Sequence, residues 1–116
     1  MNLERWQDIK TLVETKFGFD YYGQEKFEIG DNDKGQTVEA DREIIEFNGP
    51  LGKMRLEFEI KPVVLDKKVF GSKRIGGENN VTYVYSEDEK TYKLRVYKLD
   101  EASDSWVEID ASGFLG

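Results

Sequence analysis

The chain of 116 residues contains no cysteine and no histidine. Without cysteine it has no disulfide framework, no thiolate nucleophile and no thiolate-ligated zinc or iron–sulfur site. Without histidine it lacks the usual general base near neutral pH, the commonest metal ligand and the centre of a Ser–His triad. Any catalysis would depend on carboxylate, lysine, tyrosine or hydroxyl chemistry. We therefore predict no metal and no cofactor.

Long apolar segments are also missing from the sequence. No stretch approaches the ~20 apolar residues of a membrane span, and the N-terminal MNLERWQDIK lacks the apolar core of a signal peptide. The formal net charge is -7, which argues against general nucleic-acid binding and against docking on anionic lipid. We expect a soluble cytoplasmic protein with no nucleic-acid or membrane partner.

Residues 2–17 are predicted to form one helix, with Asn2 as the N-cap and Gly18 just beyond the C-terminus. Apolar residues recur on one side of this helix with its 3.6-residue period: Leu3, Trp6, Ile9, Val13 and Phe17. Lys10 falls inside the apolar stripe. Its amine is either buried with a lowered pKa or, as we favour, reaches water while its stem covers apolar surface.

The remainder, about residues 26–110, alternates between apolar and polar residues and is broken by polar turns, which is typical of antiparallel strands. The reversal of parity at the Ile44–Ile45 step predicts a β-bulge. Pro62 predicts the end of a strand, since it lacks a backbone N–H. The polar segment 87–90 predicts a turn between the next two strands.

One helix followed by six or seven antiparallel strands predicts a single α+β domain over residues 1–116, with residues 111–116 as a tail. The apolar stripe of the helix needs a partner, and a curved, mainly antiparallel sheet is the surface available to it. We expect the sheet to wrap partly around the helix, or to close toward a barrel with the helix across one end.

The loop VFGSKRIGGENN places Lys73 and Arg74 between glycines. A phosphate-binding loop of the form G-x-x-x-x-G-K-[ST] would need lysine and a hydroxyl residue where Glu78 and Asn79 stand, and a following helix. The segment is therefore predicted to be an exposed hairpin loop. If it has a function, Lys73 and Arg74 would form a basic contact for an acidic partner.

Basic and aromatic residues alternate near the C-terminus. Lys93, Arg95 and Tyr97 share one face of a predicted strand, with Trp106 alongside on the last strand. Such a surface can contact the side chains of a partner. In the alternative, Tyr97 and Trp106 lie under the helix or plug a barrel end, because large aromatic side chains are highly buried on average.

These observations predict a non-catalytic binding module that contacts a protein or peptide through Lys93, Arg95, Tyr97 and Trp106. One alternative is a small-molecule binding protein with an apolar ligand between the helix and the curved sheet. Another is an enzyme that uses carboxylates or Lys10, which we disfavour because no catalytic constellation is visible. The oligomeric state is left open.

From FNGPLGKMRLEFEIKPVVLDKK through RIGGENNVTYVYS to DSWVEIDASGF, residues 47–114, the chain resembles a group of short uncharacterised bacterial proteins. That group has no assigned activity. The resemblance therefore implies a bacterial protein but no function and no site residues.

Overall fold

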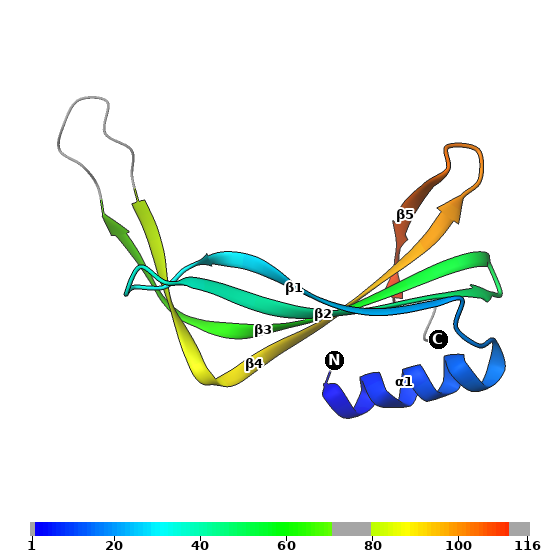
Figure 1. Ribbon diagram of the computed structural model, residues 1–116, viewed down its shortest axis with the longest axis horizontal. Coiled ribbons are helices and arrows are strands. Elements are labelled where there is room, and N and C mark those ends of the chain that lie inside the picture. The colour runs from blue at the N-terminus through cyan, green and yellow to red at the C-terminus, as the bar shows by residue number, and fades with distance from the viewer. Residues whose placement is uncertain (1, 71–79, 112–116) are drawn as a thin grey trace.

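The computed structural model describes residues 2–70 and 80–111, so the predicted basic contact of Lys73 and Arg74 lies outside the described residues. The elements are α1 (Leu3–Lys16), β1 (Tyr21–Asp31), β2 (Thr37–Gly49), β3 (Gly52–Phe70), β4 (Asn80–Asp100) and β5 (Ser105–Ile109). The five strands form one antiparallel sheet in the order β1-β2-β3-β4-β5, and α1 lies against one of its faces (Figure 1). The predicted α+β class is confirmed.

Both ends of α1 are capped by the residues that the sequence indicated. The Asn2 side chain accepts a hydrogen bond from the Arg5 backbone N–H at 2.7 Å. At the other end, Gly18 has φ +74°, and its N–H bonds to the Val13 and Glu14 carbonyls. Glycine adopts this left-handed conformation without a steric cost, which ends the helix.

The core lies between α1 and the middle of the sheet. From α1 it takes Trp6, Ile9 and Val13, and from the sheet seven residues: Ile45, Phe47, Met54, Leu56, Phe58, Leu94 and Val96. Trp6 stacks on Phe58 with ring centroids 4.7 Å apart. Leu3 and Phe17, at the two ends of the predicted stripe, remain half-exposed.

The prediction of six or seven strands is wrong because two expected breaks are absorbed inside long strands. Pro62 pairs with Lys90 and Val64 pairs with Tyr85, so β4 carries extra residues at this point. Within this excursion the Ser86 hydroxyl accepts hydrogen bonds from the backbone N–H groups of residues 88 and 89. The expected strand end and the expected turn are thus two sides of one bulge.

The sheet is also not closed into a barrel. Merging the expected strands leaves five, and β1 and β5 remain at opposite edges of the order. The sheet curls most at one end, where Asn32 forms an isolated bridge with Tyr83 of β4.

The predicted bulge at Ile44–Ile45 is wrong for a different reason. The register with β3 is continuous there, with Ile44 opposite Glu57 and Ile45 opposite Leu56. Both isoleucines are nonetheless buried. Strand β2 thus buries one isoleucine on each of its faces, without an inserted residue.

Of the described residues, none belongs to a helix that is long and apolar enough to cross a membrane.

Candidate functional site

The alternation of β3 gives the sheet two different faces. Met54, Leu56 and Phe58 are buried in the core with α1, so Glu57 and Glu59 project to the opposite side. No element of the described chain covers that side, which we call the helix-free face. Figure 1 shows both ends of the sheet rising away from α1, which makes the helix-free face concave.

Charged side chains of alternating sign run across the helix-free face. Each of the five strands contributes one member, and we call the set the charge ladder: Glu25, Arg42, Glu59, Arg95 and Glu108. Arg42 lies 2.7 Å from Glu25 and 3.3 Å from Glu59. Arg95 lies 3.5 Å from Glu59 and 3.4 Å from Glu108. Opposite charges on neighbouring strands stabilise a sheet.

Glu59 lies at the centre of the ladder and is only 4% exposed. Burial raises the pKa of its carboxyl, but the charges and hydrogen bonds of Lys61, Arg95 and Arg42 outweigh burial, and the pKa is lowered. Burial likewise lowers the pKa of Arg42, yet its glutamate partners, Glu25 first, leave that pKa raised. The central members of the ladder are therefore held in their charged forms.

The ladder also covers an aromatic ring. The guanidinium of Arg42 lies 4.2 Å from the centroid of the Phe27 ring, and the ammonium of Lys61 lies 5.7 Å from it. A cation over an aromatic face is attracted by the ring quadrupole. Arg42 is thereby fixed by Phe27 as well as by its carboxylate partners.

The structure places all four predicted contact residues on the helix-free face. Lys93 and Arg95 lie opposite Glu59 and Glu57 of β3, and Tyr97 shares their parity. Trp106 pairs with Leu99, which has the same parity again. The alternative with Tyr97 and Trp106 under the helix is wrong, because α1 packs on the other face.

The four residues differ in what they contact. Arg95 is engaged in the charge ladder. In the described part of the chain, the side chains of Lys93, Tyr97 and Trp106 have no hydrogen-bond or ion-pair partner. The pKa of Tyr97 is raised by burial and by the nearby carboxylates of Glu57 and Glu108, so its hydroxyl stays protonated.

Sequence reasoning missed the members of the ladder on β1, β2 and β3. The alternation of β3 placed Glu57 and Glu59 on the wet side of a strand, but nothing local distinguished a solvated charge from a buried one. Burial of Glu59 comes from Arg42 and Arg95 on the two neighbouring strands. The burial of Glu59 therefore depends on the register between strands, which cannot be predicted from the periodicity of one strand.

Lys10, the other singled-out residue, forms a part-buried ion pair with a residue of the sheet. Its ammonium lies 2.9 Å from Glu43 Oε2, and the Trp6 indole N–H donates to the same oxygen at 2.9 Å. The Lys10 and Glu43 side chains are 17% and 16% exposed. This contact ties α1 to β2.

The space between α1 and the sheet is filled by core side chains such as Trp6 and Phe58, which stack there. A cavity of about 210 Å³ nevertheless remains beside α1, with Val13, Phe17 and Pro50 in its lining. The alternative of an apolar ligand between helix and sheet therefore stays a prediction. Among the described residues no group of three or more carboxylates is arranged to hold a metal ion.

Comparison with known proteins adds nothing to this geometry. No family model, no curated protein and no solved structure matches the chain. The resemblance to short bacterial proteins stays a prediction. The function proposed below is derived from the geometry and chemistry of the helix-free face.

Proposed function

We propose that the chain is a non-catalytic interaction module that binds a protein or peptide on its helix-free face. One observation carries the proposal. The charges of the charge ladder pair with one another, while Lys93, Tyr97 and Trp106 beside them have no hydrogen-bond or ion-pair partner among the described residues. Tyrosine and tryptophan are the residue types that most often anchor protein interfaces.

The chemistry of the unpartnered groups indicates what the partner offers. The Lys93 ammonium and the Trp106 indole N–H are hydrogen-bond donors only, and the Tyr97 hydroxyl is donor and acceptor. A partner segment with carboxylates or free backbone carbonyls would satisfy all three. Because the charge ladder already holds Arg95 in place, this contact residue would lose little conformational entropy on binding.

A peptide-display selection on the immobilised protein tests the proposal. We expect it to enrich acidic peptides, and we expect the affinity of the best peptide to fall about tenfold or more in Lys93→Glu and Trp106→Ala. Lys16→Glu is the matched control, since Lys16 is an exposed lysine on α1, on the other side of the sheet. Raised salt should weaken the complex, because the Lys93 contact is screened.

Two results would contradict the proposal. If Tyr97→Ala and Trp106→Ala unfold the protein, their side chains belong to the core and not to a contact surface. If the selected peptides bind Lys93→Glu, Trp106→Ala and Lys16→Glu equally well, they bind elsewhere. Circular dichroism on each variant separates the first result from the second.

A further inference from the structure

The helix side of the sheet carries exposed apolar residues beyond the part that α1 covers. By register, Met54 of β3 lies opposite Lys98 of β4, and Lys98 lies opposite Val107 of β5. Met54 is fully buried, whereas Val107 is 47% exposed. Leu51, in the turn between β2 and β3, is 51% exposed. Apolar surface thus continues from the core onto β5.

A pocket of about 630 Å³ opens at this place, between the β2–β3 turn and the β4–β5 hairpin. Its lining includes Leu51, Lys98, Val107 and Ile109. Small-molecule sites typically measure about 300–1,000 Å³ and are mainly apolar with a few placed polar groups. The pocket matches that description in size. Its lining is mixed, because the charged residues Lys53, Lys98, Asp100 and Glu101 accompany the apolar ones.

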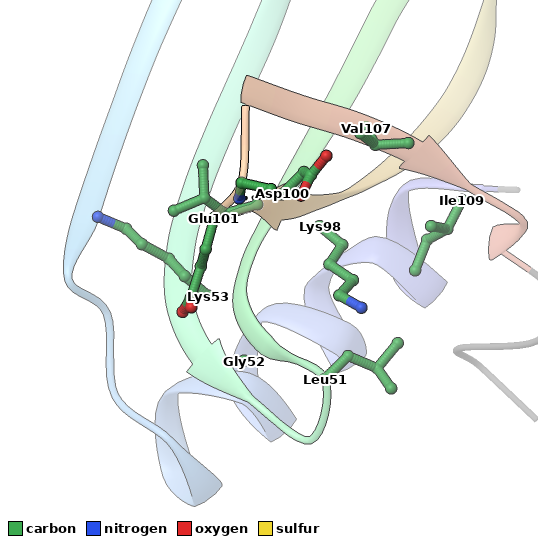
Figure 2. A pocket seen from close by; sticks show the side chains of 10 residues that line it. Leu51, Gly52, Lys53, Lys98, Asp100, Glu101, Val107 and Ile109 are labelled. Atoms are coloured by element: carbon green, nitrogen blue, oxygen red, sulfur yellow. Dashed lines mark hydrogen bonds between the residues drawn. The ribbon is translucent and has the colours of Figure 1, made fainter. Parts of the chain in front are cut away.

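Of the charged residues that line the pocket, Lys98 lies next to the apolar side chains. Figure 2 shows its side chain running between Leu51 and Ile109, while the side chains of Lys53 and Glu101 extend away from it. In the described part of the chain, the Lys98 ammonium has no ion-pair partner, although the sequence contains 24 acidic residues.

Asp100 and Glu101 also line the pocket, and neither forms an ion pair with Lys98 in the described part of the chain. The Asp100 carboxylate accepts hydrogen bonds from the Ala102 backbone N–H at 3.1 Å and from the Ser103 hydroxyl at 3.0 Å. It is used to form the β4–β5 turn. The positive charge of Lys98 is therefore available to a ligand.

We propose that this pocket binds an aliphatic carboxylate, with the carboxylate on Lys98 and the alkyl chain on Leu51, Val107 and Ile109. Charge complementarity selects the anionic head group, and burial of apolar surface selects the chain. The site is distinct from the helix-free face, because Lys98 and Lys93 lie on β4 with opposite parity. It also gives a different location to a ligand that the sequence alone would place between helix and sheet.

The probe is sodium decanoate, titrated below its micelle concentration into ¹⁵N-labelled protein. We expect saturable shifts of the amide signals of Leu51, Lys98, Val107 and Ile109. Lys98→Met keeps the length of the side chain without its charge, and it should weaken decanoate binding about fivefold, the size expected for a half-exposed ion pair. Lys90→Met, also on β4 but at the bulge, is the matched control and should bind as the unmodified chain does.

A second variant and a second ligand keep the test decisive. Val107→Asp places a carboxylate on an exposed position of β5, so the fold should persist while decanoate is repelled. Decanol, which lacks the charge, should bind the unmodified chain more weakly than decanoate does. On Lys98→Met, decanol and decanoate should bind with equal affinity. Absence of saturable shifts, equal binding of decanoate and decanol, or equal loss in Lys90→Met and Lys98→Met would overturn the proposal. Binding of only a peptide with a free C-terminal carboxylate would also overturn it.

Discussion

At the scale of single residues, Glu43 of β2 joins the sheet to two side chains of α1. One of its oxygens accepts from both the Trp6 indole and the Lys10 ammonium. A buried carboxylate is costly unless it is paired and hydrogen-bonded. The three side chains therefore depend on one another, but not equally, because Glu43 is the acceptor for both donors.

This asymmetry predicts unequal costs of substitution. Glu43→Ala should lower the free energy of unfolding by about 3 kcal/mol, because it leaves a part-buried ammonium and a buried indole N–H without an acceptor. Lys10→Ala should lower it by only about 1 kcal/mol, since Glu43 keeps the hydrogen bond from Trp6. Urea denaturation measures both, with Lys16→Ala on the exposed side of α1 as the control. A larger cost for Lys10→Ala than for Glu43→Ala would contradict the assignment.

Glu59 predicts an effect of pH on stability. Its folded pKa is lowered, so the unfolded chain binds this proton at a higher pH than the folded chain does. The ionised Glu59 therefore stabilises the fold above its unfolded pKa of about 4.3, and that contribution is lost as the pH falls through the folded pKa.

We expect Glu59→Gln to lower the free energy of unfolding at pH 7 by about 1–3 kcal/mol, because its cations lose a charged partner. Below the unfolded pKa the difference between Glu59→Gln and the unmodified chain should shrink. Urea denaturation at a series of pH values measures this. Glu101→Gln, at an exposed turn position, should follow the unmodified chain throughout. A difference for Glu59→Gln that grows as the solution is acidified would contradict the assignment.

At the scale of elements, the sequence predicted what depends on local chemistry. The caps of α1 at Asn2 and Gly18 and the alternation of β3 are encoded in neighbouring residues, and all are present in the structure. The bulge at Pro62 was not predictable from the same information. Pro62 lacks an N–H, but β3 continues because β4 supplies extra residues opposite it. The proline at residue 62 and the polar segment 87–90 are distant in the sequence, and only their pairing in the sheet makes them one bulge.

The candidate site divides in the same way. The shared face of Lys93, Arg95 and Tyr97 followed from the two-residue period of a strand. Which face α1 would cover did not follow, since both faces of β4 carry aromatic residues. The partners of Arg95 were not predictable from the sequence either. Glu59 and Glu108 lie on the neighbouring strands, and the register of the sheet brings them next to Arg95.

Gly30 lies at the curled end of the sheet, where we expect a side chain to be poorly tolerated. It lies at the register shift of β1 and has φ +149°, a conformation open almost only to glycine. A Cβ atom there would lie 3.0 Å from the Tyr85 hydroxyl oxygen. Gly30→Ala should therefore lower the free energy of unfolding by about 1–3 kcal/mol.

The double variant Gly30→Ala/Tyr85→Phe separates the two causes of that cost. Removal of the hydroxyl relieves the contact but not the backbone strain, so part of the stability should return relative to Tyr85→Phe alone. Gly35→Ala is the comparison for strain without contact, since Gly35 has φ +77° and open space around its Cβ position. Urea denaturation that finds Gly30→Ala as stable as the unmodified chain would contradict the close approach of β4 to β1.

At the scale of the whole molecule, β4 connects two surfaces of different character. After its bulge, the odd-numbered residues 91–99, including Lys93, line the helix-free face. The even-numbered residues lead from the buried Val96 to Lys98 beside the pocket. One layer of sheet separates the two lysines. With a formal net charge of -7, the chain thus presents a positive group at each proposed contact.

The two surfaces should act independently. Lys93 and Lys98 are separated by five residues of extended chain, about 16 Å at the rise of a strand, and they share no side-chain partner in the described residues. Sites at such a separation usually have additive effects, and at physiological salt a charge neutralised on Lys98 is screened over about 8 Å. Saturating decanoate should therefore change the affinity of a selected acidic peptide by less than about twofold.

Isothermal titration with peptide, in the presence and absence of decanoate, measures this coupling. The reverse titration should give the same factor, because coupling between two sites is reciprocal. Lys98→Met should move any effect of decanoate to about fivefold higher decanoate concentration, without changing peptide affinity in its absence. A tenfold change in peptide affinity would mean that decanoate shifts β4 between two arrangements, because neither direct contact nor screened charge links the two faces. The helix-free face would then be a regulated surface and not a preformed one.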